Sequence, residues 1–176
     1  TPDGRRIAFR SVHSGVRTVA WQRAEGGAPP ELLIREWVSP GSWSPDGRQV
    51  VATLSISGNA QIYAMDANGG QPRRLTQSGS IDTEPVFSAD GRAIYFVSDR
   101  GGSPQIYRMG AQGDNPQRLT FVGSESTSPA PSPDGRWLVV EDRKADASFL
   151  GRVPSKANPP TFQKLTSRHL YSVRFS

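Results

Sequence analysis

The sequence predicts an all-β fold, a β-propeller built from four-stranded antiparallel blades. A unit of about 43 residues occurs four times along the chain, and each unit contains four short apolar runs typical of strands. The 176 residues include 18 Gly and 15 Pro, which favour strands and tight turns over long helices. Helical solenoids are excluded, because apolar residues almost never recur with the helical period.

The repeat is defined by a turn of the form Ser/Thr-Pro/Ala-Asp-Gly. Pro fixes φ, Asp accepts hydrogen bonds from nearby backbone and Gly tolerates positive φ, so the tetrad suits a tight turn between the first two strands of a blade. We expect one domain over residues 1–176, either a whole propeller or half of one. The turn aspartates are Asp3, Asp46, Asp90 and Asp134, spaced 43, 44 and 44 residues apart.

Each unit is expected to form four strands, as the third unit illustrates. Its strands are predicted at 84–88 (EPVFS), 93–98 (AIYFVS), 105–109 (QIYRM) and 117–121 (QRLTF). The chain ends on YSVRFS at 171–176, a first-strand pattern whose turn stands at the other end of the chain, in TPDG. We therefore expect this C-terminal strand to complete the first blade and to close the ring.

The motifs SPDGR, SDRGGSPQIY, RLT and DTEPVF resemble the propeller domain of the TolB family, periplasmic components of the Tol-Pal envelope system. The resemblance is strongest between Ser42 and Val140, and residues 1–40 are closer to the wider class of TolB-like repeats. It implies a protein-binding propeller, a periplasmic location and a Pal-like lipoprotein as partner. It also implies a binding surface at the loop before TEP: Ser80, Ile81, Asp82, Thr83 and Glu84, with Glu125, Ser126 and Thr127 one blade later.

Catalytic and cofactor motifs are missing from the sequence. There is no GxSxG elbow, phosphate-binding loop, HExxH or EF-hand loop, and the absence of Cys excludes disulfides and thiolate metal sites. A Ser precedes each turn, and because it occurs once per blade we interpret it as a turn residue rather than a nucleophile. These serines are Ser44, Ser88, Ser132 and Ser176. The sequence thus predicts a non-enzyme without cofactor or metal.

Histidine and acidic residues leave one alternative open. His13 and His169 are expected on loops of one face, where a shared metal is conceivable, although two ligands make a poor site and solvated loop histidines are the favoured interpretation. Acidic residues are predicted around the mouth of the channel on the same face, either solvated or as a partner or cation site. They are Glu36, Asp82, Glu84, Asp99, Glu125, Asp142 and Asp146.

The net charge of +5 and the pI of about 10.1 raise the question of nucleic acid or an anionic membrane. The arginines argue against nucleic acid, because they are spread around the ring: Arg5, Arg48, Arg92 and Arg136 each follow a turn Gly. No apolar run is long enough to predict membrane insertion.

The preferred interpretation is a non-enzymatic TolB-like scaffold or protein-binding module, including an engineered or recombined propeller. The alternatives are a natural Tol-Pal-type periplasmic component and the gating propeller of a prolyl-oligopeptidase-type hydrolase. We also expect two chains to form an eight-bladed ring. Blades shaped for about 60° change less to span about 45° in eight blades than about 90° in a four-bladed monomer.

Overall fold

The structure is a computed structural model that describes residues 1–13, 15–35, 37–56, 58–144, 147–156 and 161–166. In this part of the chain the regular secondary structure consists of fifteen β-strands. The first two repeat units contain β1 Arg6–His13, β2 Val16–Arg23, β3 Glu31–Arg35, β4 Trp37–Trp43, β5 Gln49–Leu54, β6 Gln61–Asp66 and β7 Arg73–Arg74. The other two contain β8 Asp82–Phe87, β9 Ala93–Ser98, β10 Gln105–Gly110, β11 Gln117–Arg118, β12 Glu125–Pro131, β13 Trp137–Lys144, β14 Ala147–Pro154 and β15 Gln163–Lys164.

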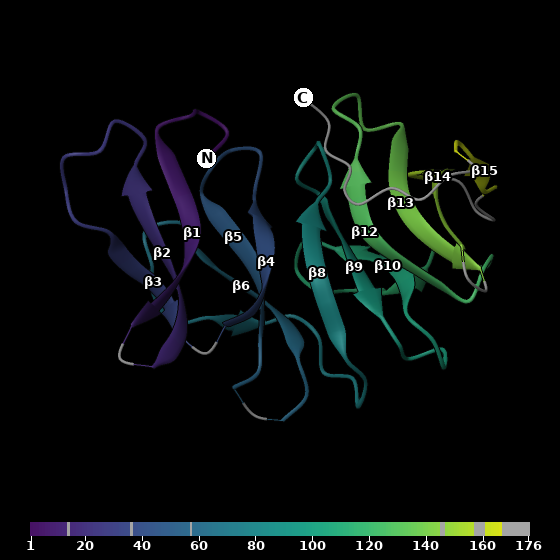
Figure 1. Cartoon of the computed structure of the whole chain (residues 1–176), viewed down its shortest axis with the longest axis horizontal. Helices are drawn as coiled ribbons and strands as arrows, with labels where there is room; N and C mark the ends of the chain where they lie inside the picture. The colour runs from purple at the N-terminus through teal and green to yellow at the C-terminus, as the bar shows by residue number, and fades with distance from the viewer. Residues whose placement is uncertain (14, 36, 57, 145–146, 157–160, 167–176) are drawn as a thin grey trace.

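The strands form four antiparallel sheets, each made by one repeat unit. The first sheet is β1-β2-β3, and the other three are four-stranded, with the orders β4-β5-β6-β7, β8-β9-β10-β11 and β12-β13-β14-β15. The sheets stand in a row, with the first and the last at opposite ends (Figure 1). The predicted antiparallel blades are therefore confirmed, with three described strands in the first of them.

Ring closure is not seen among the described strands, which form an open row (Figure 1). The predicted C-terminal strand at 171–176 lies outside the described residues, as do Ser176 and His169. The described part of the chain holds no helix that is long and apolar enough to cross a membrane.

The turn between the first two strands of each blade has the predicted chemistry. In the second unit the hydroxyl of Ser44 donates to Asp46 Oδ1 over 2.6 Å, and the same oxygen accepts the backbone N–H of Arg48 at 3.1 Å. Gly47 sits at φ 70°, where a side chain would be strained. Because Ser88 and Ser132 bond Asp90 and Asp134 in the same way, these serines are confirmed as turn residues.

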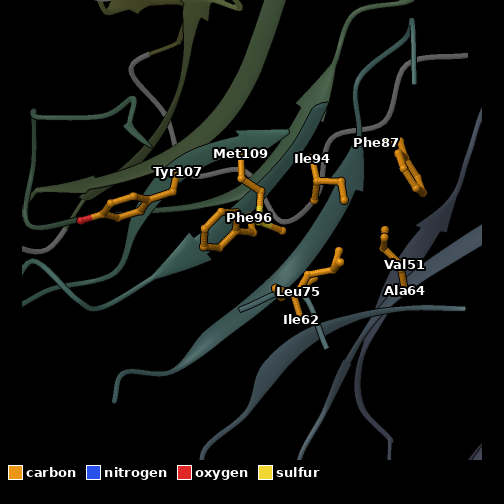
Figure 2. Close-up of a cluster of buried hydrophobic side chains, with 9 residues drawn as sticks. All are labelled: Val51, Ile62, Ala64, Leu75, Phe87, Ile94, Phe96, Tyr107 and Met109. Carbon is orange, nitrogen blue, oxygen red and sulfur yellow. The ribbon is translucent and has the colours of Figure 1, made fainter. Parts of the chain in front are cut away.

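The hydrophobic core lies between the sheets. Alternate residues of β9 face opposite neighbours, since Ile94 and Phe96 pack toward the second sheet while Tyr95 and Val97 pack toward the fourth. Figure 2 shows the cluster between the second and third sheets: Val51, Ile62, Ala64, Leu75, Phe87, Ile94, Phe96, Tyr107 and Met109. Both faces of the central blades are buried, so the order of the sheets and the positions of their loops are fixed by packing.

The outer strands are shorter than predicted. β11 is only two residues long, whereas the sequence predicts a strand over 117–121. The reason is that a side chain takes the place of a backbone partner in the pairing of β10 with β11: the backbone N–H of Ile106 donates to the hydroxyl of Thr120 at 2.9 Å. Thr76 does the same for Ile62 in the preceding blade. The motif RLT therefore ends an outer strand by capping it.

Candidate protein-binding face

One edge of the sheet row carries the loops that the sequence singles out. The links from β5 to β6, from β7 to β8, from β9 to β10 and from β11 to β12 lie along this edge, at the bottom of Figure 1. Backbone hydrogen bonds tie neighbouring links together, since Asp82 N donates to Ala60 O and Ser126 N donates to Pro104 O, over 2.9 and 2.8 Å. We call this edge the mouth face. The Asp-Gly turns occupy the opposite edge.

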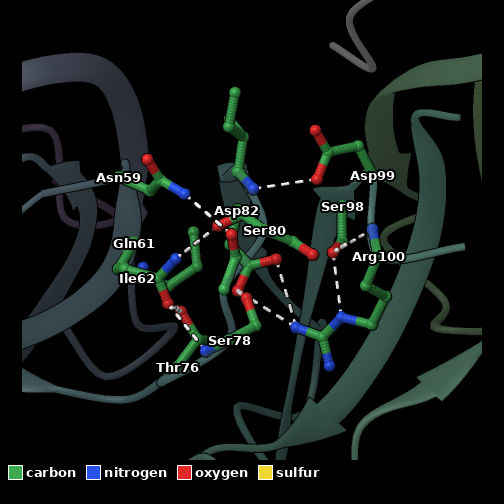
Figure 3. A network of polar contacts seen from close by, with 12 residues as sticks. Asn59, Gln61, Ile62, Thr76, Ser78, Ser80, Asp82, Ser98, Asp99 and Arg100 are labelled. Atoms are coloured by element: carbon green, nitrogen blue, oxygen red, sulfur yellow. Dashed lines mark hydrogen bonds and ion pairs between the residues drawn. The ribbon is translucent and has the colours of Figure 1, made fainter. Parts of the chain in front are cut away.

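The loop before β8 is held in place by the blade that precedes it. Gln61 is buried on β6, and its amide donates to the carbonyl of Ser80 at 2.6 Å while its carbonyl oxygen accepts from the Thr76 hydroxyl at 3.0 Å. From the other side, the Ile81 N–H donates to the Asp99 carboxylate at 2.8 Å. Figure 3 shows how these contacts converge on the loop. The exposed Ile81 side chain therefore projects from an anchored segment.

Asp82 lies at the centre of this network and is fully buried. Arg100 Nη2 donates to both of its carboxylate oxygens, at 3.1 and 3.0 Å, and the Ser78 hydroxyl donates at 2.8 Å (Figure 3). The guanidinium carbon of Arg100 also lies 5.3 and 5.0 Å from the ring centroids of Phe96 and Tyr107. Asp82 thus anchors the loop and presents no surface to a partner.

Glu84 joins two blades near the middle of the row. Glu84 adopts a φ of 53° at a register shift between Thr83 and Val86. Ser128 in the next blade has a φ of 54°. The Glu84 carboxylate accepts the backbone N–H of Ser128 at 2.8 Å. A left-handed conformation at a residue other than Gly costs about 1–3 kcal/mol, so packing and this bond must hold it. This bond joins Glu84 of the first predicted group to Ser128, the residue that follows the second group.

The second predicted group, at the start of β12, is partly buried. Glu125 pairs with Arg143 at 3.2 Å on the surface, whereas Ser126 is buried and donates to Asp142 Oδ1 at 2.5 Å. Burial raises the pKa of the Asp142 carboxyl, and the hydrogen bond from Ser126 opposes that rise. Of the eight predicted residues, Asp82 and Ser126 are inaccessible; the accessible ones are Ser80, Ile81, Thr83, Glu84, Glu125 and Thr127.

Most of the carboxylates predicted around the mouth are buried or engaged within the protein. Asp82 and Asp142 are buried, Glu84 and Asp99 accept backbone N–H groups, and Glu125 has a cation beside it. Glu36 and Asp146 lie outside the described residues. In the part of the chain that is described, no three His, Asp or Glu residues lie close enough to hold a metal ion. The described carboxylates therefore help to build and join the loops.

Exposed apolar side chains are the feature of this face that the sequence interpretation missed. Phe121 and Val122 directly follow the RLT motif, at the start of the link from β11 to β12. Seven large hydrophobic residues are exposed in the described part of the chain, and four of them lie in the links of the mouth face. These four are Ile56, Ile81, Phe121 and Val122, with exposed fractions between 45% and 63%.

Comparison with known proteins identifies the repeat. The family described as TolB beta propeller domain matches residues 1–170. The Protein TolB homolog of Chlorobium chlorochromatii (strain CaD3) is 36% identical over 88 residues, which are 50% of this chain and 20% of that protein. The Tol-Pal system protein TolB of Anaeromyxobacter dehalogenans (strain 2CP-C) is 41% identical over 86 residues, 49% of this chain and 20% of that protein. The match therefore spans a small part of these relatives.

Solved structures agree on the fold. TolB from Acinetobacter baumannii superposes with a TM-score of 0.83 at 33% identity, over 96% of this chain and 42% of that one. A putative TolB from Agrobacterium tumefaciens gives 0.83 at 28% identity, over 93% of this chain and 62% of that one. A puromycin hydrolase gives 0.79 at 15% identity, over 100% of this chain and 32% of that one, a likeness of fold alone.

Proposed function

The chain belongs to the TolB beta propeller domain family, and we propose that it is a non-enzymatic module that binds a protein partner through its mouth face. The observation that carries the proposal is the gathering of exposed apolar side chains on that face. Isolated exposed hydrophobic residues are ordinary, but several gathered on one edge of a repeat protein are typical of a binding surface. The opposite edge carries the polar Asp-Gly turns.

The mouth face also has the mechanical properties of a docking surface. Ile81 is presented by a loop whose backbone is bonded by Gln61 and Asp99, so little conformational entropy is lost when a partner covers it. Phe121 packs beneath the guanidinium of Arg118, whose central carbon lies 5.0 Å from the ring centroid. Aromatic residues with an adjacent arginine are common centres of binding energy at protein interfaces.

For the partner we propose a Pal-like lipoprotein, and for the location the periplasm. The support is the relative whose name places it in the Tol-Pal system, together with the DTEP segment at 82–85. The accessible residues Thr83 and Glu84 follow Ile81 in the chain, so one segment presents both polar and apolar groups.

The test is capture of a purified Pal-like soluble domain by the immobilised chain. We expect the parent chain to bind and the Ile81→Ser/Phe121→Ser variant to lose most of the binding, because both exposed apolar anchors are removed. Thr83→Ala/Glu84→Ala should also weaken capture. Arg48→Ser is the control, since Arg48 is exposed in an Asp-Gly turn on the opposite edge. Failure of the parent to bind, or equal loss in the Arg48 control, would refute the proposal.

The hydrolase alternative has weaker support. Likeness to puromycin hydrolase extends to the fold at 15% identity, and a propeller of that kind requires a separate catalytic domain to cleave a peptide. Purified chain is expected to leave fluorogenic proline-containing peptides intact. Cleavage that copurifies with the chain would favour the hydrolase interpretation instead.

We further propose that two chains associate through the ends of the sheet row into an eight-bladed ring. Ile7 supports this dimer. Its neighbour Ala8 pairs with Trp21, which packs on the second sheet, so Ala8 faces that sheet. Because side chains alternate along a strand, Ile7 points to the outer side of the first sheet, where its side chain is 54% exposed. A propeller blade normally buries both faces. Light scattering should give twice the single-chain mass of 19.1 kDa; that single-chain mass across a wide concentration range would exclude the dimer.

A further inference from the structure

A cavity of about 230 Å³ opens between the third and fourth sheets at the edge of the Asp-Gly turns, away from the mouth face. Tyr95 of β9 and Arg108 of β10 line it from one blade, the turn around Asp134 lines it from the next, and Asp90 and Lys156 also contribute. None of these residues is used by the proposed protein-binding face.

The repeat shows that this cavity is a departure from the ordinary interface between blades. The positions of Tyr95 and Arg108 correspond, one unit earlier, to Val51 and Ala64. Those two residues are buried in the apolar cluster between the second and third sheets (Figure 2). An arginine and a tyrosine thus stand where the preceding interface packs aliphatic side chains, and the cavity opens beside them.

The guanidinium of Arg108 lacks a hydrogen-bond acceptor at its Nε among the described residues, although this atom is buried. Tyr95 is 2% exposed beside it; burial raises the pKa of its phenol, and the positive charge of Arg108 opposes the rise. The phenol is therefore a neutral hydroxyl at ordinary pH. A buried guanidinium nitrogen without an acceptor is unfavourable, and a small turn of the side chain toward an acceptor in the cavity would relieve this cost.

The carboxylates at the cavity are already engaged. Asp90 Oδ1 accepts from the Ser88 hydroxyl and from the Arg92 backbone, at 2.7 and 3.1 Å. Asp134 Oδ2 accepts from Arg136 Nε at 2.6 Å. Lys156 Nζ lies 3.6 Å from Asp90 Oδ2, a loose contact that leaves most of its donor capacity unused. The cavity therefore has spare donors and few spare acceptors.

We propose that this cavity binds a small oxyanion, a carboxylate or a phosphate group, which accepts hydrogen bonds from the Arg108 guanidinium and lies within reach of the Lys156 ammonium. Guanidinium matches both groups, because its planar donors pair with two oxygens at once. Because the cavity lies between the third and fourth blades, a bound anion would hold these two blades together.

Nuclear magnetic resonance titration tests the site. Sodium phosphate and sodium acetate are added separately to the ¹⁵N-labelled chain, with sodium chloride of equal ionic strength as reference. We expect a saturable shift of the Arg108 Nε–Hε signal with at least one of the two anions. Saturation by phosphate alone or by acetate alone supports the site and identifies its group. Shifts no larger than those of chloride would overturn it.

Matched variants separate a site from general attraction to a basic protein. Arg108→Gln should weaken binding by about tenfold or more, because the charged donor is lost. Arg152→Gln is the control: Arg152 is the equivalent residue one blade later, but its guanidinium lies 4.0 Å from the Trp137 ring centroid and bonds Gln163. Equal weakening in both variants would refute the proposal.

A third variant covers the case in which Arg108→Gln fails to fold. Arg108→Met places an apolar side chain at a position that is apolar one unit earlier, so it should fold and melt at or above the temperature of the parent in chloride. Phosphate or acetate should raise the melting temperature of the parent and leave that of Arg108→Met unchanged. A rise of equal size in the variant would contradict the site.

Discussion

The third and fourth blades each bury one carboxyl at the root of the mouth face, but on opposite strands of the same pair. In the third blade Asp82 on β8 faces Ser98 on β9, and in the fourth Ser126 on β12 faces Asp142 on β13. The two residue types are exchanged across equivalent positions of the repeat. All four residues are fully buried.

The exchange changes what each carboxyl can reach. Asp82 is met by Arg100 and by the Ser78 hydroxyl, whereas Asp142 accepts only from Ser126, and its Oδ2 has no partner among the described residues. The fourth-blade residue equivalent to Arg100 is Lys144, which is exposed. A repeat can therefore conserve a buried polar pair while changing its electrostatics, and the blade without a cation should be the less stable one.

The largest effect is expected from removing the cation in the third blade. Arg100→Met leaves the Asp82 carboxylate buried without its counter-charge and should lower the free energy of unfolding by about 3 kcal/mol. Urea unfolding followed by circular dichroism measures it. Adding Asp82→Asn should restore part of the loss, because the stranded charge is removed.

Arg143→Met is the control for that prediction. Its pair with Glu125 is on the surface, with side chains 58% and 36% exposed, so its removal should change stability by no more than about 0.5 kcal/mol. Equal effects of the two substitutions would mean that Arg100 acts through general charge and not through Asp82.

A glycine at the equivalent place in the two loops gives the next largest effect. Gly123 has a φ of 77°, and an added Cβ would collide with the Asp142 carboxylate and lie 2.7 Å from the backbone oxygen of Arg143. Gly79, its equivalent one blade earlier, has open space around it and no positive φ. Gly123→Ala should destabilise the protein by about 2 kcal/mol, and Gly79→Ala by no more than about 0.5 kcal/mol. Thermal melting of both variants compares them directly.

The features that the sequence predicts correctly are local ones. β9 occupies the predicted residues 93–98, because its apolar residues and the flanking turns lie within one short segment. The Ser-Asp turns are predicted correctly for the same reason, because each of their hydrogen bonds joins residues no more than five apart in the sequence.

The burial of the site residues could not be predicted in this way. Asp82 and Ser126 read as loop residues, and their burial depends on groups such as Arg100 and Asp142, 18 and 16 residues further along the chain. Phe121 reads as the end of an outer strand, yet Thr120 ends the pairing before it and leaves it exposed. Such outcomes are set by contacts between strands and blades, which the repeat pattern alone does not specify.

The smallest expected effect comes from neutralising Asp142. Asp142→Asn keeps an oxygen that can accept from Ser126 and removes a charge that has no cation, so it should stabilise the protein by on the order of 1 kcal/mol at neutral pH. Urea unfolding of the variant and the parent measures the difference. Glu141→Gln is the control, a neighbouring carboxylate that is only half-buried on the same strand.

The pH dependence of that gain distinguishes a buried acid from an ordinary one. Burial raises the pKa of Asp142 in the folded protein above its ordinary value of 3.8, so the folded state binds its proton more tightly than the unfolded chain does. The stability that Asp142 contributes is therefore complete below 3.8 and is lost as pH rises through the folded pKa. The advantage of Asp142→Asn should grow as pH rises above 3.8 and should level off once the folded state has lost the proton. A variant that is less stable than the parent throughout that range would show that Asp142 is ionised and stabilising, and the contrast between the two blades would not hold.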